Sequence, residues 1–549
     1  MEMACRSARP PQACISAKVR LVCYTSLGQE AVMSQRAHLP DSLSPLQWGF
    51  SAILVITLAR LILLAKTQLQ LYPDESQYWV WSQTFDWGYF SKPPLIAWAI
   101  ATSTALFGDT DFAIRLPSLL FHAMGAGFLL LSAHQLKSGW AGLWAALVYL
   151  SMPGIGISAG VISTDALLLP LWAGALYMLL RLRDQPDRWF SAAGLGILLG
   201  LAFLAKYAAI YFLLAAGLAI VIDPPVRRAL LSPRGILAAV ILAAILAPNI
   251  FWNASHDFAT VQHTAANANW QGSLFNTGEM LEFLGGQFGV FGVLLFPVLA
   301  VACAQAWRHW RDPDRQIDRL LTLFIVPALL VVLVQSFISR AHANWAASAY
   351  VAGSLLVMLY LLRGGQWRRH ILTASIALGL AASAVMAALS VNPSLVGGVS
   401  AFRGLRHLQS WPETAAALHE AEQQGVYDAL VFDDRNIFHQ MQRYGRQLET
   451  PLRMWQRYNA PHNHAEDIWA LTEGTDGPVL IVSEREWERD RLLADFESVE
   501  PLGEIAIATG GHRERRLTLY AGRGYQRVPR TEAYEAAQSA IDAARQPGN

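Results

Sequence analysis

The chain has 549 residues, of which 54% are hydrophobic and only 15% are charged, and its mean hydropathy is +0.29. This composition is too apolar for a water-soluble protein of this length, so we expect a membrane protein with several spans. The formal net charge is +1 and no long basic run occurs, which sets nucleic acid aside as a partner.

Residues 1–47 precede the first apolar run and contain neither the apolar core of a signal peptide nor a regular hydrophobic period. We expect this segment to be disordered or to be an upstream mis-start, with Met33 as the alternative first residue. Three of the four cysteines lie here and Cys303 lies in an apolar run, so the sequence predicts no disulfide framework.

Residues 48–395 hold apolar runs that are long enough, at roughly 17 to 25 residues, to cross a bilayer. We predict about eleven transmembrane helices, within a range of about 10 to 13, and therefore a polytopic α-helical membrane protein. The runs lie near 48–66, 114–136, 139–158, 164–181, 190–205, 207–222, 235–252, 285–306, 320–337, 345–363 and 370–391.

Every second loop between these runs is rich in Lys and Arg. The positive-inside rule then places the N-terminus in the cytoplasm and the C-terminal part outside. A span at 94–107 would move Lys137 to the outer face and break the alternation, so we expect an interfacial or re-entrant helix there. Residues 67–113 then form an outer loop.

Beyond the last span the composition becomes polar. Short apolar runs at 427–432 and 479–482 predict buried strands, and residues 413–422 predict a helix. We therefore expect a small soluble α/β domain at 396–526, outside the membrane, followed by a polar tail at 527–549.

The outer loop combines charged residues with many tryptophans and tyrosines, and it contains the acidic pair Asp74 and Glu75. These carboxylates could only cap a surface helix, or Asp74 could be a general base that takes a proton from an acceptor hydroxyl. The aromatic residues could anchor the helix at the interface or stack on sugar rings. The substrate-binding candidates in this stretch are Glu75, Tyr78, Trp79, Asp86, Tyr89 and Lys92.

Long ordered motifs in this region resemble a known family. They are DESQYW at 74–79, DWGYFSKPPL at 86–95, LFGD at 106–109 and RLPS at 115–118. They resemble the bacterial family 39/83 glycosyltransferases, which include the aminoarabinose lipid A transferase and the Rgt-type galacturonosyltransferases and are related to the protein O-mannosyltransferases. The resemblance covers roughly residues 48–390 and implies the GT-C fold and a polyprenyl-phosphate-linked sugar donor.

The resemblance also implies roles for single residues. Asp74 corresponds to the acidic residue of the family's first outer loop, the usual candidate base, and Asp165 corresponds to a second acidic position at the start of a span. Asp165 could be only a helix cap, although an ionisable group at membrane depth is by default a functional candidate. Lys92 and Lys206 resemble family lysines that would bind the donor phosphate, whereas a lysine at the interface could simply snorkel.

No obligatory metal or other cofactor is expected, with a divalent metal as the alternative. The aminoarabinose transferases carry a carboxylate, associated with a metal site, directly before the lysine that Lys92 matches, whereas this chain has Ser91. His256 or His263 alone would not make a good zinc site, which needs three or four ligands. His263 is then an ordinary loop residue or helps to orient a substrate.

A short outer loop before another span carries the candidates Arg340, His342 and Asn344. Its string RAHANW resembles a stretch of some bacterial members of the family. Arginine can bind phosphate through two parallel hydrogen bonds, and a helix start offers free N–H groups to an anion. Arg340 could also merely flank the span.

The sequence thus predicts an inverting glycosyltransferase of the bacterial inner membrane, with Asp74 and Asp165 as catalytic candidates. The donor is a polyprenyl-phosphate sugar, and the acceptor is lipid A, another glycolipid, a polysaccharide or a protein, with membrane lipids as further partners. A transporter or flippase of lipid-linked sugars should show broken helices in two similar halves. A polysaccharide polymerase or ligase is the other alternative, but it is not expected to carry the motifs at 74–95.

Overall fold

A computed structural model describes residues 43–137, 139–266, 275–396, 404–405, 407–475, 477–509 and 513–545. Residues Ser44–Asn549 form one compact unit, and all elements below belong to it. The expectation for residues 1–47 falls largely outside the described part, and the first helix begins at Pro45.

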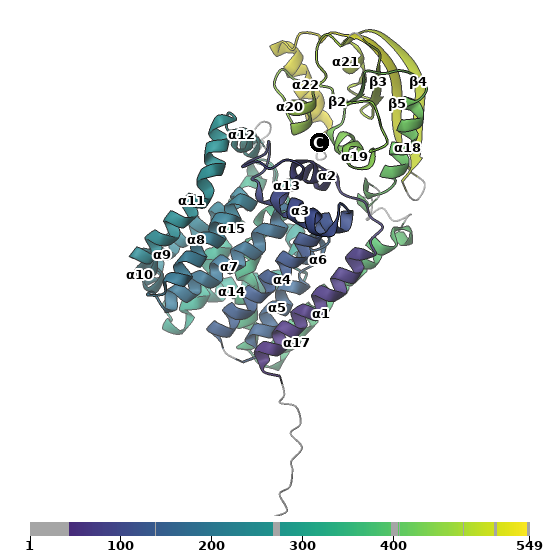
Figure 1. Cartoon of the computed structure of the whole chain (residues 1–549). Helices are drawn as coiled ribbons and strands as arrows, with labels where there is room; N and C mark the ends of the chain where they lie inside the picture. The colour runs from purple at the N-terminus through teal and green to yellow at the C-terminus, as the bar shows by residue number, and fades with distance from the viewer. Residues whose placement is uncertain are drawn as a thin grey trace, which may run out of the picture. The chain divides into compact units, whose positions relative to one another are not determined.

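The N-terminal part is a bundle of apolar helices (Figure 1). In the described part, six helices are long and apolar enough to cross a membrane, and up to eight spans result if each of two bent pairs counts as one. The six are α1 (Pro45–Ala65), α4 (Asp111–Leu136), α7 (Thr164–Asp184), α11 (Pro233–Ser255), α15 (Gln316–Ile338) with the preceding turn η2 (Pro313–Arg315), and α17 (Gln366–Val391).

The bent pairs and shorter helices complete the bundle. The chain bends by 116° between η1 (Tyr207–Ala209) with α9 (Ile210–Ile222) and α10 (Pro224–Leu230), and by 104° between α13 (Thr277–Val290) and α14 (Leu295–Arg308). The remaining elements are α2 (Pro73–Ser82), α3 (Leu95–Phe107), α5 (Ala141–Ser151), α6 (Pro153–Ser158), α8 (Trp189–Ala205), α12 (Ala259–Ala266), η3 (Ala343–Ala346), α16 (Ala349–Leu362) and η4 (Pro393–Val396). A polytopic helical fold is confirmed, while the count of about eleven spans stays a prediction.

Burial differs sharply between these helices. In α7, 83% of the most apolar window is buried, whereas the corresponding share in α1 and α11 is only 17%. Side chains such as Leu54, Val55 and Phe251 remain exposed on these outer helices. Apolar surface of this extent would be unfavourable in water but not in the hydrocarbon core of a bilayer.

The C-terminal domain is a five-stranded sheet with helices around it. The strand order is β2-β1-β3-β5-β4, in which β1 pairs parallel with β2 and β3, and β5 pairs antiparallel with β3 and β4. The strands are β1 (Ala429–Phe432), β2 (Leu452–Met454), β3 (Val479–Ser483), β4 (Phe496–Ala508) and β5 (Glu514–Tyr525). The helices are α18 (Trp411–Glu422), α19 (Arg435–Tyr444), α20 (His464–Trp469), α21 (Arg489–Leu493) and α22 (Glu532–Arg545).

The expected α/β character of this domain is confirmed, since β1, β3 and α18 fall on the runs that predicted them. The stretch expected to be a polar tail instead contains α22, whose Asp542 accepts a 2.6 Å hydrogen bond from the Tyr458 hydroxyl. Its Gln538 accepts another, of 3.0 Å, from Arg491. A polar helix of this kind gives little hydrophobic signal in the sequence, because polar contacts hold it to the domain.

Candidate active site

Helix α2 forms one wall of the site. It begins with Pro73, whose fixed φ suits a first helical position, and Asp74 and Glu75 lie in its first turn, where negative charge is favoured. The Tyr72 N–H donates to Glu75 Oε2 at 2.8 Å and closes the helix start. Consecutive helical residues point about 100° apart, so Asp74 and Glu75 face different surroundings.

Glu75 is buried within the helix bundle, with 1% of its side chain exposed. Arg115 of α4 donates to both carboxylate oxygens, from Nε at 2.9 Å and from Nη2 at 2.7 Å, and the Ile162 N–H donates to Oε1 at 2.8 Å. The other Arg115 donors bond the carbonyls of Leu69 and Gln70. Glu75, a predicted substrate-binding residue, therefore ties α2 to α4 and to the chain before α7.

Asp165, Lys206 and Asn344 meet at the ends of three segments. Asp165 lies in the first turn of α7, which Ser163 caps through the Ala166 N–H. Lys206 follows the last residue of α8 and donates from Nζ to Asp165 Oδ1 at 2.7 Å, while Asn344 in η3 donates from Nδ2 to Oδ2 at 2.7 Å. The structure thus brings together three of the predicted site residues.

Lys92 shares its electrostatic surroundings with both predicted catalytic carboxylates. Burial lowers the pKa of the Lys92 ammonium and the nearby Lys206 lowers it further, while Asp74 and Asp165 oppose this effect. Tyr78 lies beside the same carboxylates, and burial followed by the charge of Asp74 raises the pKa of its hydroxyl. These residues, with Asn344, define what we call the carboxylate–lysine centre.

The C-terminal domain also reaches this centre. Arg435, the first residue of α19, places Nη2 3.9 Å from Asp74 Oδ1, with 38% and 45% of the two side chains exposed. No motif marks Arg435 in the sequence, and it lies in the other domain, so sequence reasoning had no signal for it.

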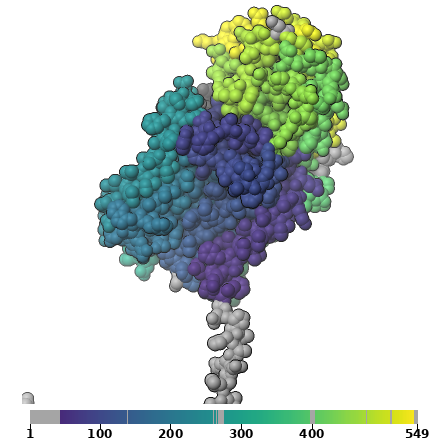
Figure 2. Space-filling view, in the orientation of Figure 1, coloured from purple at the N-terminus to yellow at the C-terminus, as the bar shows by residue number. Residues whose placement is uncertain are grey.

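Polar contacts, which we call the α19 clasp, hold α19 against α2, against the residues just before α2 and against the start of α4. Gln440 accepts from the Ser76 hydroxyl at 2.8 Å and donates to the Leu71 carbonyl at 2.7 Å. Arg443 pairs with Asp109 at 2.6 Å and Asp111 at 2.8 Å. Figure 2 shows the blue-purple surface around α2 and α3 adjoining the green surface of the C-terminal domain.

Other predicted residues lie beside a large cavity of about 1370 Å³ next to the centre. Three parts line it, namely α2 with its following loop, the end of α11, and the C-terminal domain around α20. Among the predicted site residues, Trp79, Asp86 and Tyr89 line it, whereas Asp74 and Lys92 do not.

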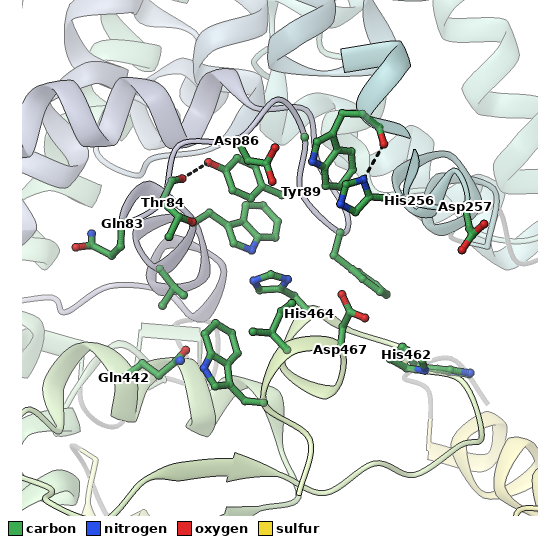
Figure 3. Close-up of a pocket in the computed structure, with 18 of the residues that line it drawn as sticks. Gln83, Thr84, Asp86, Tyr89, His256, Asp257, Gln442, His462, His464 and Asp467 are labelled. Carbon is green, nitrogen blue, oxygen red and sulfur yellow. Dashed lines mark hydrogen bonds between the residues drawn. The ribbon is translucent and has the colours of Figure 1, made fainter. Parts of the chain in front are cut away.

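Aromatic rings are prominent in the cavity wall. Tyr89 stacks on Trp81 with ring centroids 5.1 Å apart, and its hydroxyl donates to the Thr84 carbonyl at 2.7 Å. The Trp252 ring stacks on His256 at 4.1 Å. Figure 3 shows how side chains of the two domains face each other across the cavity, namely His464 and Asp467 on one side and Asp86, Tyr89 and His256 on the other.

The remaining candidates have few contacts with the centre. The Arg340 carbonyl accepts a 3.3 Å hydrogen bond from Gln335, and His342 lies edge-on to Trp345 at 5.6 Å. The side chain of His263 lies outside the described residues. Within the described part, no group of three or more His, Cys, Asp or Glu side chains could hold a metal, and the metal expectation stays a prediction.

The protein shares its fold with a solved membrane protein. ArnT from Cupriavidus metallidurans, solved bound to undecaprenyl phosphate, matches 88% of this chain and 99% of its own chain with a TM-score of 0.60 and 16% identity. At this identity the match shows the fold alone, which is the GT-C fold of a polytopic glycosyltransferase.

Sequence comparison then gives the family. The lipid A galacturonosyltransferase RgtD of Rhizobium johnstonii is 31% identical over 482 residues, which are 86% of this chain and 97% of that protein. An undecaprenyl phosphate-α-4-amino-4-deoxy-L-arabinose arabinosyl transferase of Yersinia enterocolitica is 30% identical over 240 residues, 39% of this chain and 43% of its own length. A family model for dolichyl-phosphate-mannose-protein mannosyltransferase matches residues 91–252. The chain belongs to this family of membrane glycosyltransferases, as its motifs predicted.

Proposed function

We propose that the protein moves a sugar from a polyprenyl-phosphate donor to a hydroxyl of a glycolipid acceptor, with inversion at the anomeric carbon. The observation that carries this proposal is the convergence of Asp165, Lys206 and Asn344 through two 2.7 Å hydrogen bonds. A lipid that carries a phosphate needs an apolar surface for its chain and charged groups for its phosphate. Ammonium groups beside carboxylates at the ends of apolar helices offer both.

Asp74 is the proposed general base. It takes the proton of the acceptor hydroxyl while the hydroxyl oxygen attacks the anomeric carbon, and the bond from that carbon to the phosphate oxygen breaks. The polyprenyl phosphate leaves with the bonding electron pair and one more negative charge. Asp74 suits this role because it stands in the first turn of α2 with 45% of its side chain exposed to an incoming substrate.

Lys92 and Lys206 hold the phosphate as its charge grows. Lys92 has no hydrogen-bond partner for its ammonium among the described residues, so all three of its N–H donors are available. Lys206 spends one donor on Asp165 and keeps two. We therefore assign Asp165 a positioning role, in which it fixes the direction of Lys206 and Asn344, while the cations stabilise the leaving group.

The substrate classes follow from the relatives and from the cavity. RgtD is named for lipid A and the arabinosyl transferase for undecaprenyl phosphate, and we extend both chemistries to this chain. The cavity of about 1370 Å³ takes the sugar part of the acceptor, because its aromatic faces can stack on sugar rings. Three aspartates and one arginine line it, so it does not favour an additional phosphate.

The same proposal gives the topology. The basic loops face the cytoplasm by the positive-inside rule, so α2, the carboxylate–lysine centre and the C-terminal domain lie on the periplasmic side of the inner membrane. The N-terminus is cytoplasmic. A polyprenyl-linked donor then reaches the centre from the outer leaflet.

Transfer by the purified protein in lipid nanodiscs tests the function. The donors are undecaprenyl-phosphate galacturonate and undecaprenyl-phosphate aminoarabinose, the acceptor is lipid A, and mass spectrometry measures sugar-modified lipid A and released undecaprenyl phosphate. We expect one undecaprenyl phosphate for each sugar transferred. Asp74→Asn should slow transfer by about 10²- to 10⁴-fold, the range for loss of a positioned base.

Asp187→Asn is the matched control, because Asp187 is 87% exposed and pairs only at the surface with Arg234. It should transfer at the wild-type rate. Full activity of Asp74→Asn would remove Asp74 as the base. Flux of the lipid-linked sugar across the bilayer without any transfer product would instead support the transporter alternative.

A further inference from the structure

We propose that Arg435 of the C-terminal domain binds the phosphate of the lipid donor, so that this domain supplies part of the active site. The inference rests on the proposed function, since it assigns a further group to the same donor. It goes beyond the family motifs, which all lie before residue 396.

The local structure fixes where Arg435 stands. Asp434 caps α19 by accepting hydrogen bonds from the N–H groups of Asn436 at 2.7 Å and Ile437 at 3.3 Å. The carboxylate of Asp434 in turn binds Arg485 of its own domain at 2.7 Å. The backbone of Arg435 is thereby held at the helix start, and its side chain extends toward α2.

The guanidinium of Arg435 donates no hydrogen bond within the described part of the chain. Its nearest carboxylate oxygen, on Asp74, is 3.9 Å away, which is too far for a hydrogen bond. Arg115, by contrast, donates hydrogen bonds to Glu75 and to two carbonyls, and Arg443 donates hydrogen bonds to Asp109 and Asp111. Arg435 therefore keeps the paired N–H groups that recognise phosphate.

The contact with Asp74 does not explain Arg435 as a docking residue. A half-exposed ion pair at this distance adds little to stability, because water screens the attraction between the two charges. The α19 clasp already fixes the helix through buried or nearly buried side chains, among them Gln440 and Arg443, with 6% of the Arg443 side chain exposed. Docking of the domain therefore does not depend on Arg435.

The charge arrangement around the centre favours an anion as the missing partner. Burial lowers the pKa of the Lys92 ammonium most, Lys206 and Arg435 lower it further, and Asp74 and Asp165 raise it. The three cations Lys92, Lys206 and Arg435 therefore stand against two carboxylates, which leaves an excess of positive charge. A phosphate among these cations would relieve the repulsion. Because the leaving phosphate gains a charge during transfer, each cation also binds the transition state more strongly than the bound donor.

Binding of undecaprenyl phosphate to the full-length protein in nanodiscs tests the proposal directly. Arg435→Gln should weaken this binding by about 10- to 100-fold, the range for loss of charged hydrogen bonds, and should lower kcat/KM for the donor at least as much. Arg435→Lys should keep part of the binding, and added guanidinium ions should restore part of the activity of Arg435→Ala. The unfolding temperatures of all three Arg435 variants should equal that of the wild type.

Arg516→Gln is the matched control. It makes the same change in the same domain, at a residue with 63% of its side chain exposed and paired to Glu504 and Glu514, and it should bind undecaprenyl phosphate as the wild type does. Wild-type binding by Arg435→Gln would overturn the proposal. Equal loss in Arg435→Gln and Arg435→Lys, with lower unfolding temperatures and no rescue by guanidinium, would show a structural role and overturn it too.

The two proposals fail separately. If the wild type transfers no sugar from either donor, the proposed function fails, while the binding of undecaprenyl phosphate still measures the role of Arg435. If the wild type transfers sugar and Arg435→Gln transfers it equally well, only the inference about Arg435 fails.

Discussion

Glu75 and Asp74 are neighbours in sequence, yet the structure predicts that only replacement of Glu75 lowers the stability of the protein. Glu75→Gln keeps the shape of the side chain but leaves the Arg115 guanidinium buried without a counter-charge. All four contacts of Glu75, with Arg115 Nε and Nη2 and with the N–H groups of Tyr72 and Ile162, are 2.7–2.9 Å long. The amide replaces one acceptor oxygen with a donor, so at least one N–H group is also left unpaired.

Breaking a buried ion pair at one partner costs about 3–5 kcal/mol, and we expect that loss in the free energy of unfolding of Glu75→Gln. Unfolding can be followed by tryptophan fluorescence during titration of the micellar protein with sodium dodecyl sulfate. Asp74→Asn is the matched control, because its carboxylate is 45% exposed and should change the stability by less than about 1 kcal/mol.

A double variant tests whether the loss of stability comes from the unpaired charge of Arg115. Glu75→Gln combined with Arg115→Met removes the uncompensated charge, and it should recover part of the lost stability. Recovery should be incomplete, because the carbonyls of Leu69 and Gln70 lose their donors. Equal stability of Glu75→Gln and the wild type would refute the claim that this pair holds α2 in place.

Three further predictions concern other parts of the site. Donor binding should weaken as the pH rises through the lowered pKa of Lys92, because the ammonium loses its proton, and Lys92→Arg should move that weakening to higher pH. A donor KM that does not change with pH up to the ordinary pKa of a lysine would contradict the role of Lys92 in donor binding. Arg443→Gln should loosen the α19 clasp, so that trypsin cleaves between the two domains faster while each domain stays folded; unchanged cleavage would show that Arg443 is not needed for docking. Trp469→Ala should raise the KM for the acceptor several-fold through lost stacking in the cavity, with the KM for the donor as the internal control; a larger effect on the donor would place the acceptor elsewhere.

The class of fold and the family could be predicted from the sequence, whereas the roles of the charged site residues stay predictions. Hydrophobic runs and loop charges indicated a polytopic protein, and the resemblance to the family singled out Asp74, Lys92, Asp165 and Lys206 as candidates. The run at 139–158 was predicted as one span, but Pro153 has no N–H to donate, and the chain forms α5 and α6 there. Breaks of this kind change the count of spans without changing the composition.

Other parts of the site carry no signal in the sequence. Most residues of α2 are buried, some against the bundle and others against α19, so the pattern of apolar residues does not say that Glu75 faces inward. The position of Arg435 depends on how α19 packs, and residues such as Gln440 and Arg443 look like ordinary polar surface residues until their partners are known. Contacts between distant segments are set by tertiary packing, which a single sequence does not display.

Helix α2 connects the helix bundle to the C-terminal domain. Glu75 ties it to the bundle and Ser76 ties it to α19, while Asp74, the proposed base, keeps 45% of its side chain exposed. A shift of the C-terminal domain would therefore move Arg435 and the base together. Substitutions in the α19 clasp should for this reason lower kcat without touching a substrate, because a displacement of about 1 Å at a reacting group can slow a reaction by about 10²-fold.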